Sequence, residues 1–600
     1  MIYINDKKDC CGCNACGDIC GHDAITFEID KEGFWYPQVS PKKCTDCGLC
    51  DKVCPIINIK DLKKNDFEEP HCHAAIHKNL EIRFDSTSGG LFSALAEKMY
   101  RDGGYVGGVI YNEDFSASHF ISNNKQDLLK LRSSKYLQSD ASGFYSQVRK
   151  LLRDGQKVLV CGTPCQMTAL RTFLNKDYEN LLIVDFICFG VASPKAHRKY
   201  FDALEKKYNS KVIYFKAKNK ELGWRNLTKK SIFSNGKSYY GIKGQDTYSR
   251  AYHSNKINRP SCYNCVFKGF PRISDISMGD YWGIEKIAKE LDDNIGTSAV
   301  IINSRKGEAY FDTVKNKLKT KETTIASLLS GNPALIKSLD LPQYDRTAFF
   351  EDMDKMDFLA LSERHFPMPK ESKKRKIRRY LGYGKLFYDL TQLKMKPVWQ
   401  FFKLNFFTKG ITSNWRKGHL IYPSPYSIFQ LEKGSQIILN GNVRFGTKKF
   451  KKSKLESRLL IEEGGKLIID GDIRFGYGCD IEVFRNAELV FGGGGGNIGL
   501  TLICGEKIHI GANTWYGRDV SIRDSNGGHT IAQQGFKDTN PVIIGDSVWL
   551  CSNCSIMPGI KIGDGTIVGS HTLVISSLPP RSLVSGNPAK ILDDNISWKH

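Results

Sequence analysis

Apolar residues in the last third of the chain recur at an interval of six. The pattern of residues 431–446 returns thirty positions later, at 461–476. The same interval continues downstream without a break, through Ile544, Leu550, Ile556, Ile562, Val568 and Val574. A hexapeptide period with small residues at the turns is typical of a parallel β-helix. We therefore predict an all-β domain over residues 416–600, with the glycine run 492–496 as a flexible insertion.

Residues 71–360 alternate two other apolar patterns. Short β-rich runs such as 157–160 and 181–184 stand between amphipathic stretches of helical period, of which 91–99 is one. This alternation is typical of an α/β domain. No apolar run reaches the roughly eighteen residues needed to span a bilayer, and the first cysteines leave no room for an export signal. We therefore expect a cytoplasmic protein.

Residues 1–60 hold nine of the 19 cysteines, and the polar segment 60–70 is expected to be a linker. The spacing Cys-x2-Cys-x2-Cys-x3-Cys occurs twice, at Cys10, Cys13, Cys16 and Cys20 and again at Cys44, Cys47, Cys50 and Cys54. This doubled run is the bacterial two-cluster ferredoxin pattern, in which the fourth cysteine ligates the other cluster. We therefore predict a ferredoxin-like α+β module with two 4Fe-4S clusters, in which Cys54 completes the first ligand set and Cys20 the second.

Two other uses of the cysteines fit less well. Zinc ribbons pair two Cys-x2-Cys knuckles and do not use a doubled run of four. Disulfides are typical of exported proteins, whereas this chain is expected to stay in a reducing compartment.

Much of the formal net charge of +23 lies in a segment that we expect to be a linker, residues 361–415. Within it, residues 367–410 carry twelve Lys or Arg against two acids, interleaved with aromatic residues. Two interpretations remain open: a segment lying on an anionic membrane surface, or a solvated helix packed against the chain's own domains. Nucleic acid is not an expected partner because no recognisable binding motif accompanies the charge.

Several motifs resemble the coenzyme F-420 hydrogenase/dehydrogenase β-subunit family over about residues 1–360. They lie at residues 88–90, 134–136, 161–166, 185–194 and 274–283. The resemblance implies an α/β domain that binds FAD and receives electrons from the clusters. The cofactor-binding residues implied are Ser88, Gly89, Gly90, Lys135, Tyr136, Thr163, Pro164 and Gln166. A Ser-Gly-Gly turn before a helix suits a backbone-lined anion site at a helix N-terminus, and only the resemblance to the family makes a flavin pyrophosphate its expected occupant.

Four further cysteines lie in or beside these motifs, namely Cys165, Cys188, Cys262 and Cys265. They are candidate ligands of a third cluster, with Cys72 and Cys161 as substitutes. Buried structural cysteines or a zinc knuckle are the alternatives.

The hexapeptide period and the closing segment 579–590 resemble the hexapeptide acyltransferases, which have a left-handed β-helix. The resemblance implies trimers with acetyl-CoA between neighbouring chains. Proton removal from an acceptor hydroxyl suits a histidine, and His529 lies where that family has its catalytic base. Asp524 is expected to orient its ring. Trp549, Asn587 and Lys590 lie where relatives contact CoA or close the groove.

The sequence thus predicts a bifunctional enzyme, an iron-sulfur flavoprotein oxidoreductase joined to an O- or N-acetyltransferase of cell-surface polysaccharide biosynthesis. Expected partners are an electron donor, a glycan or lipid-linked glycan acceptor and, through the β-helix, two further copies of the chain. Two alternatives remain: an electron-transfer subunit whose β-helix only trimerises it, and a deazaflavin-dependent oxidoreductase.

Overall fold

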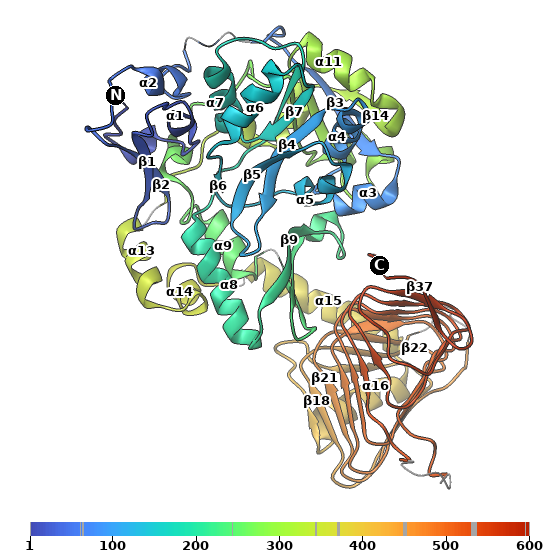
Figure 1. Ribbon diagram of the computed structural model, residues 1–600. Helices are drawn as coiled ribbons and strands as arrows, with labels where there is room; N and C mark the ends of the chain where they lie inside the picture. Colours follow the sequence, from blue (N-terminus) through green and yellow to red (C-terminus); the bar gives the residue numbers. More distant parts are fainter. Residues whose placement is uncertain are drawn as a thin grey trace. The chain divides into compact units, whose positions relative to one another are not determined.

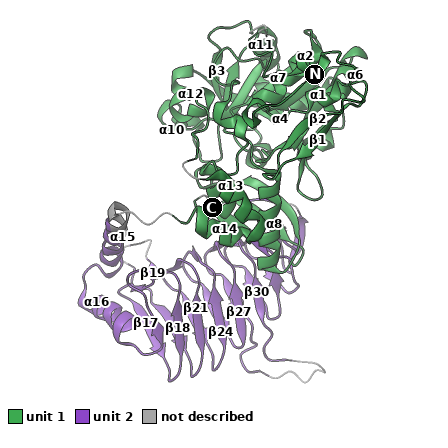
Figure 2. Cartoon of the chain, turned by 90° about the vertical axis from the view of Figure 1, so that its left-hand side faces the viewer, with its two compact units in different colours: residues 1–235, 239–368, 599–600 green, residues 236–238, 369–598 purple. Residues whose placement is uncertain are grey.

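A computed structural model of the chain describes residues 2–60, 62, 65–242, 244–342, 345–368, 373–447, 450, 453–529, 537–594 and 596–598. The chain divides into two compact units (Figure 2): residues 1–235, 239–368 and 599–600 form unit 1, and residues 236–238 and 369–598 form unit 2. No helix in the described ranges is both long enough and apolar enough to cross a membrane.

The cysteine-rich segment of unit 1 folds around one antiparallel strand pair. Its elements are η1 (Lys7–Asp9), α1 (Ala15–Asp18), β1 (Ile25–Ile29), β2 (Trp35–Val39) and α2 (Leu49–Val53). Each short helix carries one cysteine of a different predicted run, Cys16 in α1 and Cys50 in α2, and Figure 1 shows both helices on the same side of the β1–β2 pair. The segment belongs to the same compact unit as residues 71–235 and 239–368.

A nine-stranded sheet forms the centre of unit 1. The strand order is β14-β3-β13-β12-β8-β7-β4-β5-β6. The strands are β3 (His71–His77), β4 (Tyr105–Tyr111), β5 (Ala117–Ser122), β6 (Ser139–Asp140), β7 (Val158–Gly162), β8 (Leu181–Phe186), β12 (Ile276–Asp280), β13 (Ser298–Ile302) and β14 (Leu318–Thr323). The two apolar runs taken as strands are β7 and β8, so the predicted α/β domain is confirmed.

Helices and a second, smaller sheet complete unit 1. The helices are α3 (Leu80–Asp85), α4 (Leu91–Arg101), α5 (Leu128–Leu131), α6 (Phe144–Arg153), α7 (Pro164–Leu174), α8 (Pro194–Tyr208), α9 (Thr247–His253), α10 (Ile284–Ile287), α11 (Arg305–Asp312), α12 (Ile325–Gly331), α13 (Arg346–Lys355) and α14 (Phe358–His365). The second sheet has the order β11-β10-β9, from β9 (Val212–Asn219), β10 (Thr228–Phe233) and β11 (Ser238–Ile242). The predicted helix 91–99 is α4, whose buried face packs on the central sheet.

Three sheets of short strands make unit 2 a parallel β-helix. The first is β15 (Ile411–Thr412), β18 (Gln436–Leu439), β21 (Lys466–Ile469), β24 (Glu488–Phe491), β27 (Lys507–Ile510), β30 (Val542–Ile544) and β33 (Lys561–Ile562). The second is β16 (Ile421–Pro423), β19 (Val443–Thr447), β22 (Ile473–Gly476), β25 (Gly494–Gly496), β28 (Thr514–Tyr516), β31 (Trp549–Leu550), β34 (Ile567–Val568), β36 (Leu583–Ser585) and β37 (Lys590–Asp593). The third is β17 (Ser427–Leu431), β20 (Ser457–Ile461), β23 (Asp480–Val483), β26 (Thr501–Cys504), β29 (Ser521–Arg523), β32 (Ser555–Ile556) and β35 (Leu573–Val574). The predicted all-β domain is confirmed, and its left hand stays a prediction.

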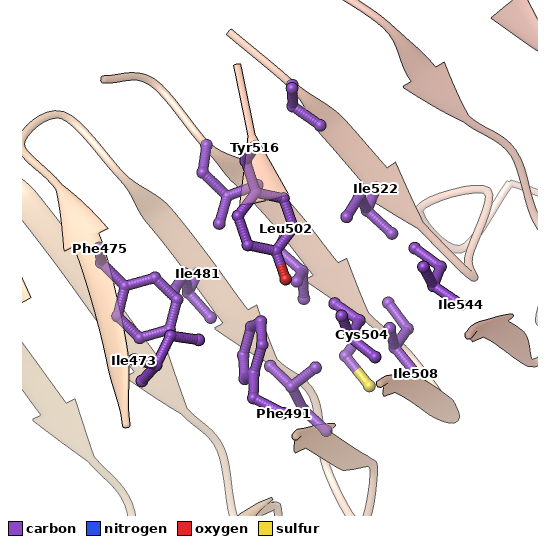
Figure 3. Packing of buried hydrophobic residues seen from close by; sticks show 14 of the residues in the cluster. Ile473, Phe475, Ile481, Phe491, Leu502, Cys504, Ile508, Tyr516, Ile522 and Ile544 are labelled. Atoms are coloured by element: carbon purple, nitrogen blue, oxygen red, sulfur yellow. The ribbon is translucent and has the colours of Figure 1, made fainter. Parts of the chain in front are cut away.

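The sequence repeat corresponds to successive coils. Leu431 pairs with Ile461 across one coil, which is the thirty-residue repeat, and Ile544 pairs with Ile562 in a coil of three hexapeptides. Aliphatic and aromatic side chains from all three sheets fill the interior (Figure 3). Because each inward position stacks on its counterpart in the next coil, the core is continuous along the coils.

The glycine run corrects one prediction. Gly494–Gly496 is strand β25, paired with β22 and β28, and is not a flexible insertion. A Cβ atom on Gly494 would lie 2.0 Å from the carbonyl oxygen of Thr514. Only glycine therefore lets the two coils approach this closely here.

Most of the described part of the predicted basic linker is helical. It contains α15 (Lys373–Thr391), α16 (Met395–Phe402) and a π-helical turn (Lys403–Phe407). Leu390 and Phe401 pack with Leu420 and Tyr422 of the first coil. This contact agrees with the second interpretation given above, in which the basic segment is a helix packed against the chain's own domains. The side chains of most of the basic run 373–379 lie outside the described residues, as do positions 61, 63 and 64 of the segment 60–70.

Candidate functional site

The first predicted ligand set gathers at the interface between the cysteine-rich segment and the central sheet. Burial, followed by the neighbouring thiols of Cys13, Cys10 and Cys54, raises the pKa of Cys16 well above its ordinary value. Burial also raises the pKa of Cys54 to about 11. These four side chains are the ones that the ferredoxin pattern assigns to one cluster. Their thiols therefore lie close enough to influence one another.

The second predicted set, Cys20, Cys44, Cys47 and Cys50, lines a single small cavity beside the β1–β2 pair. Backbone N–H groups already point at three of these sulfurs. Ile2 donates to Cys50 Sγ at 3.3 Å, Ala24 to Cys20 Sγ at 3.4 Å, and Asp46 to Cys44 Sγ at 3.4 Å. Such N–H donors stabilise a thiolate and help to tune a metal that it ligates.

A third group of thiols lines another cavity of unit 1. Its cysteines are the predicted Cys165, Cys188, Cys262 and Cys265, together with Cys11 from the N-terminal segment. Cys11 hydrogen-bonds to both Cys13 and Cys165, so this one thiol connects the first and third groups. Sequence reasoning did not assign Cys11 to this group. Its position next to Cys10 was the available signal.

Among the described residues, no group of three or more His, Cys, Asp or Glu side chains is arranged to hold a metal ion. The iron-sulfur ligand sets therefore stay predictions. The all-thiol composition of the three groups nevertheless fits iron-sulfur chemistry, for which cysteine thiolates are the usual ligands.

A cavity of about 950 Å³ occupies the centre of unit 1. Six of the eight predicted flavin-binding residues line it, namely Ser88, Gly90, Lys135, Tyr136, Thr163 and Gln166. Gly89 lies behind the wall, and Pro164 lines the third thiol cavity instead. Ligand pockets commonly measure about 300–1,000 Å³, so the size fits a large cofactor.

The N-terminus of α4 opens into this cavity, because Gly90, Leu91 and Phe92 all line it. Gly90 precedes the helix with a φ of +92°, in the left-handed region. Its neighbour Gly89 donates its N–H to Ser298 Oγ at 2.9 Å, and a Cβ there would lie 2.2 Å from the carbonyl oxygen of Ala75. The first N–H groups of a helix have no partner within it, so this end of α4 is a ready anion site.

A charged pair that was not found from the sequence lines the same cavity. Lys218 Nζ donates to Asp280 Oδ2 at 2.7 Å, and Ser88 Oγ hydrogen-bonds the other oxygen of the same carboxylate. Burial is the largest effect and raises the pKa of Asp280, but the Lys218 charge, the hydrogen bonds from Lys218 and Ser88 and the Lys220 charge together make the net shift downward. Asp280 stands in the family-like motif 274–283, whereas nothing in the sequence singles out Lys218.

Aromatic rings stand beside this pair. Trp224 and Trp282 stack with ring centroids 4.4 Å apart and planes 6° apart, and the Lys218 ammonium lies 5.4 Å from the ring centroid of Tyr136. Lys135 instead donates to four backbone carbonyls at the end of α5, at 2.7–3.2 Å. Burial lowers the pKa of Lys135 to about 7.

In unit 2, the predicted base lies on an excursion from the coil. One coil takes 18 residues from Ile544 to Ile562, whereas the coil from Ile508 to Val542 takes 34. The excursion is closed by the pairing of Ser525 with Thr539. His529 lies on it with an exposed side chain, and the next described residue is 537.

The structure corrects the role expected for Asp524. Its buried carboxylate accepts the backbone N–H groups of Gly505 at 2.5 Å, Glu506 at 3.0 Å and Lys507 at 2.6 Å. Within the described residues, no hydrogen bond joins it to His529. Asp524 therefore holds the turn of the preceding coil. Asp524 and His529 are close in sequence, but this closeness does not reveal which backbone groups of the neighbouring coil lie next to Asp524.

The predicted CoA-contacting residues lie near the end of the coil. Trp549 is half-exposed on β31 and lies against Trp598, with ring centroids 5.7 Å apart and planes tilted by 41°. Asn587 and Lys590 are exposed beyond β36. Among the described positions, no hydrogen bond or ring contact joins these residues to His529.

The fold and the thiol groups define a protein with a cysteine-rich α/β unit around a cofactor-sized cavity and a separate parallel β-helix. Residues 155–327 match the family model for the C terminus of the coenzyme F420 hydrogenase/dehydrogenase beta subunit, and residues 541–576 match that of the bacterial transferase hexapeptide (six repeats). The chain thus carries a domain of the first family and a hexapeptide-repeat transferase domain.

Individual relatives resemble parts of the chain. One relative is WcaF of Escherichia coli (strain K12), which is named as a colanic acid biosynthesis acetyltransferase. It is 30% identical over 109 residues, which are 15% of this chain and 60% of WcaF. Galactoside O-acetyltransferase of the same organism is 28% identical over 127 residues, 21% of this chain and 59% of that protein. The chain thus spans about 60% of the length of these curated relatives. A chain of the F420-reducing NiFe hydrogenase complex from Methanosarcina barkeri aligns with a TM-score of 0.31 and 18% identity, over 50% of this chain and 95% of that one.

Proposed function

We propose that the chain is a bifunctional enzyme: unit 1 is an iron-sulfur flavoprotein oxidoreductase and unit 2 an acetyl-CoA-dependent acyltransferase. The wall shared by two cavities carries the first half of this proposal. Cys188 lines both the third thiol cavity and the large cavity, as do Phe189, Gly190 and Val191. Thiol ligands and a cofactor-sized space therefore adjoin within one compact unit, which is the arrangement that electron transfer between two bound cofactors requires.

The two thiol groups of the N-terminal segment would each hold one 4Fe-4S cluster. The third thiol group would hold a third cluster. FAD would occupy the large cavity. When bound, 4Fe-4S clusters carry single electrons and a flavin exchanges electrons with organic substrates. The N-terminal N–H groups of α4 would bind the flavin pyrophosphate, with Gly89 and Gly90 permitting the close approach.

Other residues of the large cavity would orient bound molecules. The Lys218–Asp280 pair is held in a fixed geometry by Ser88, so it places one donor and one acceptor at a defined position on the wall. The stacked Trp224 and Trp282 present flat apolar surface beside it and exclude water. Lys135, whose ammonium faces α5 carbonyls, fixes the loop that carries Tyr136.

In unit 2, His529 would remove the proton from an acceptor hydroxyl or amine as the acetyl thioester is attacked. Trp549, Asn587 and Lys590 would contact CoA. Among the described residues no hydrogen bond or ring contact joins these residues to His529, so the proposal includes a homotrimer in which a neighbouring coil supplies the opposite wall. The curated relatives with acetyltransferase names support this half.

The name of WcaF supports a role in cell-surface polysaccharide biosynthesis. We assign the enzyme to the cytoplasm, with a glycan or lipid-linked glycan as acceptor and a separate reduced protein or cofactor as electron donor. Contact with the inner membrane surface through the basic segment is part of the same proposal. Exposed Trp399, Phe402 and Phe407 beside lysines support it.

Anaerobic purification followed by iron, sulfide and flavin analysis tests the first half. We expect one FAD and about twelve iron atoms per chain if all three thiol groups hold 4Fe-4S clusters. Cys262→Ser should remove about four of these irons, whereas Cys479→Ser in the β-helix core should remove none. Absence of iron and flavin from the anaerobic wild-type protein would refute this half.

Acetyl-CoA turnover tests the second half. His529→Ala should lower the rate of acetyl transfer to a glycan acceptor by about 10²–10⁴-fold, while His509→Ala, an exposed histidine on β27, should retain the wild-type rate. Equal rates for His529→Ala and wild type would remove the acyltransferase claim. In that case the alternative is a β-helix that only assembles the trimer. The role of Asp524 in holding a coil turn, and not His529, favours this alternative. Reduction of a deazaflavin in the same anaerobic preparation would identify the other alternative.

A further inference from the structure

One arginine of the central domain extends into the cysteine-rich segment. Arg259 lies just before η4 (Pro260–Asn264), and its side chain is fully buried. Its Nε donates to the carbonyl oxygen of Cys10 at 2.8 Å and its Nη1 to Gln138 Oε1 at 2.7 Å. Its Nη2 donates to the carbonyl oxygen of Trp35 at 3.0 Å and approaches Cys10 Sγ at 3.6 Å.

No carboxylate compensates this charge within the described part of the chain. All the oxygen atoms that accept from Arg259 are neutral, and no salt bridge includes it. The guanidinium carbon lies 4.4 Å from the ring centroid of Tyr36 and 5.3 Å from that of Phe34. A buried charge without a counter-charge is strongly unfavourable. The fold therefore requires an anion next to Arg259.

Arg259 adjoins thiols of two different groups. Its Nη2 lies 3.6 Å from Cys10 Sγ, and its carbonyl oxygen accepts the backbone N–H of Cys262 at 3.0 Å. Cys10 belongs to the first predicted ligand set and Cys262 to the third thiol group. Arg259 thus lies between the two groups.

We propose that Arg259 is the fixed counter-charge of the cluster assigned to Cys10, Cys13, Cys16 and Cys54, and that it raises the reduction potential of that cluster. The inference rests on the proposed iron-sulfur function. Reduction adds one electron, supplied in the experiment by dithionite, and breaks no bond to the protein. A buried cation and an N–H···S contact stabilise the added negative charge more than the oxidised state.

This placement gives the two groups different roles. The second thiol group, at the other end of the module, has backbone N–H donors but, among the described residues, no hydrogen bond from a buried cation. The cation therefore favours the electron on the side of the module that faces the third group and the large cavity. Arg259 acts as a positioning residue for charge and does not itself react.

The experiment is an anaerobic redox titration followed by electron paramagnetic resonance on the whole chain. In Arg259→Gln, the ratio of reduced to oxidised first cluster at a fixed potential should fall at least tenfold, which is about 59 mV for one electron. Arg259→Lys, which keeps the charge, should shift less. A wild-type potential in Arg259→Gln, with iron content unchanged, would overturn the proposal.

Two further variants separate charge from structure. Arg346 also joins the cysteine-rich segment to the central domain, but its guanidinium is paired with both oxygens of Glu32 at 2.8 and 2.7 Å. Arg346→Gln should therefore leave the potential unchanged, and an equal shift in both variants would show mere loosening and refute the proposal.

If Arg259→Gln does not assemble the cluster, Gln138→Glu decides the question. This change places a carboxylate next to Arg259 and should lower the potential while the arginine remains. An unshifted potential in that variant refutes the counter-charge. Wild-type protein without iron would instead refute the proposed function, so the two failures are distinguishable.

Discussion

Replacing Asp524 by asparagine should open the coil locally. Oδ1 accepts one backbone N–H and Oδ2 accepts two, all from residues 505–507. The amide of asparagine best keeps its oxygen at the Oδ2 position, which turns its NH₂ group toward the N–H of Gly505. One charge-assisted hydrogen bond is then lost and two buried donors face each other, at a cost of about 2–4 kcal/mol.

Native-state hydrogen exchange followed by mass spectrometry measures this effect locally. Amide exchange in segment 505–507 should become about 30 to 900 times faster, since about 1.4 kcal/mol corresponds to a factor of ten. Asp472→Asn is the matched control, because Asp472 is exposed and accepts one backbone N–H, from Asn442 at 3.0 Å, which an amide oxygen can also accept. Unchanged amide exchange in Asp524→Asn, together with loss of acetyl transfer, would refute the structural role. It would instead support the role first expected for Asp524, which is to orient the ring of His529.

Three further outcomes follow from the packing. Gly89→Ala brings a Cβ within 2.2 Å of the β3 backbone and should lower the flavin bound per chain, whereas Gly384→Ala, with no heavy atom within 4 Å, should not. Ile544→Ala should cost about 2–5 kcal/mol in urea unfolding of unit 2, because the side chain is fully buried. Lys218→Met leaves the buried Asp280 carboxylate without its salt-bridge partner, which raises its pKa above the unfolded value. The folded state then binds more protons than the unfolded state, so the melting temperature of this variant should fall as the pH rises from 4 to 7, unlike that of the wild type.

The sequence predicts best the features that its spacing encodes. The six-residue interval identified the coil strands because every inward position of a β-helix repeats at that interval. The cysteine spacing likewise identified two thiol groups that the structure gathers separately. In contrast, the five-residue distance between Asp524 and His529 indicated a contact that the described residues do not make, because stacking joins Asp524 to residues of the previous coil.

Residues that act across long sequence distances were missed. Lys218 reaches Asp280 from the second sheet, and Arg259 reaches Cys10 across 249 positions. A lysine or an arginine in an ordinary polar context gives no sign of burial, and the buried partner becomes visible only when the fold is known. Cys11 was visible in the sequence, but its two thiol partners were not.

The last strand of the coil has a consequence for assembly. Strand β37 runs antiparallel to β36 and ends a sheet that is parallel everywhere else. An open parallel edge with a continuous apolar interior would accept the first coil of another chain, and a stack of such chains would grow into a filament. The reversed strand presents the wrong direction for that pairing, while α16 packs near the first coil at the other end. Both features disfavour end-to-end stacking of two coils.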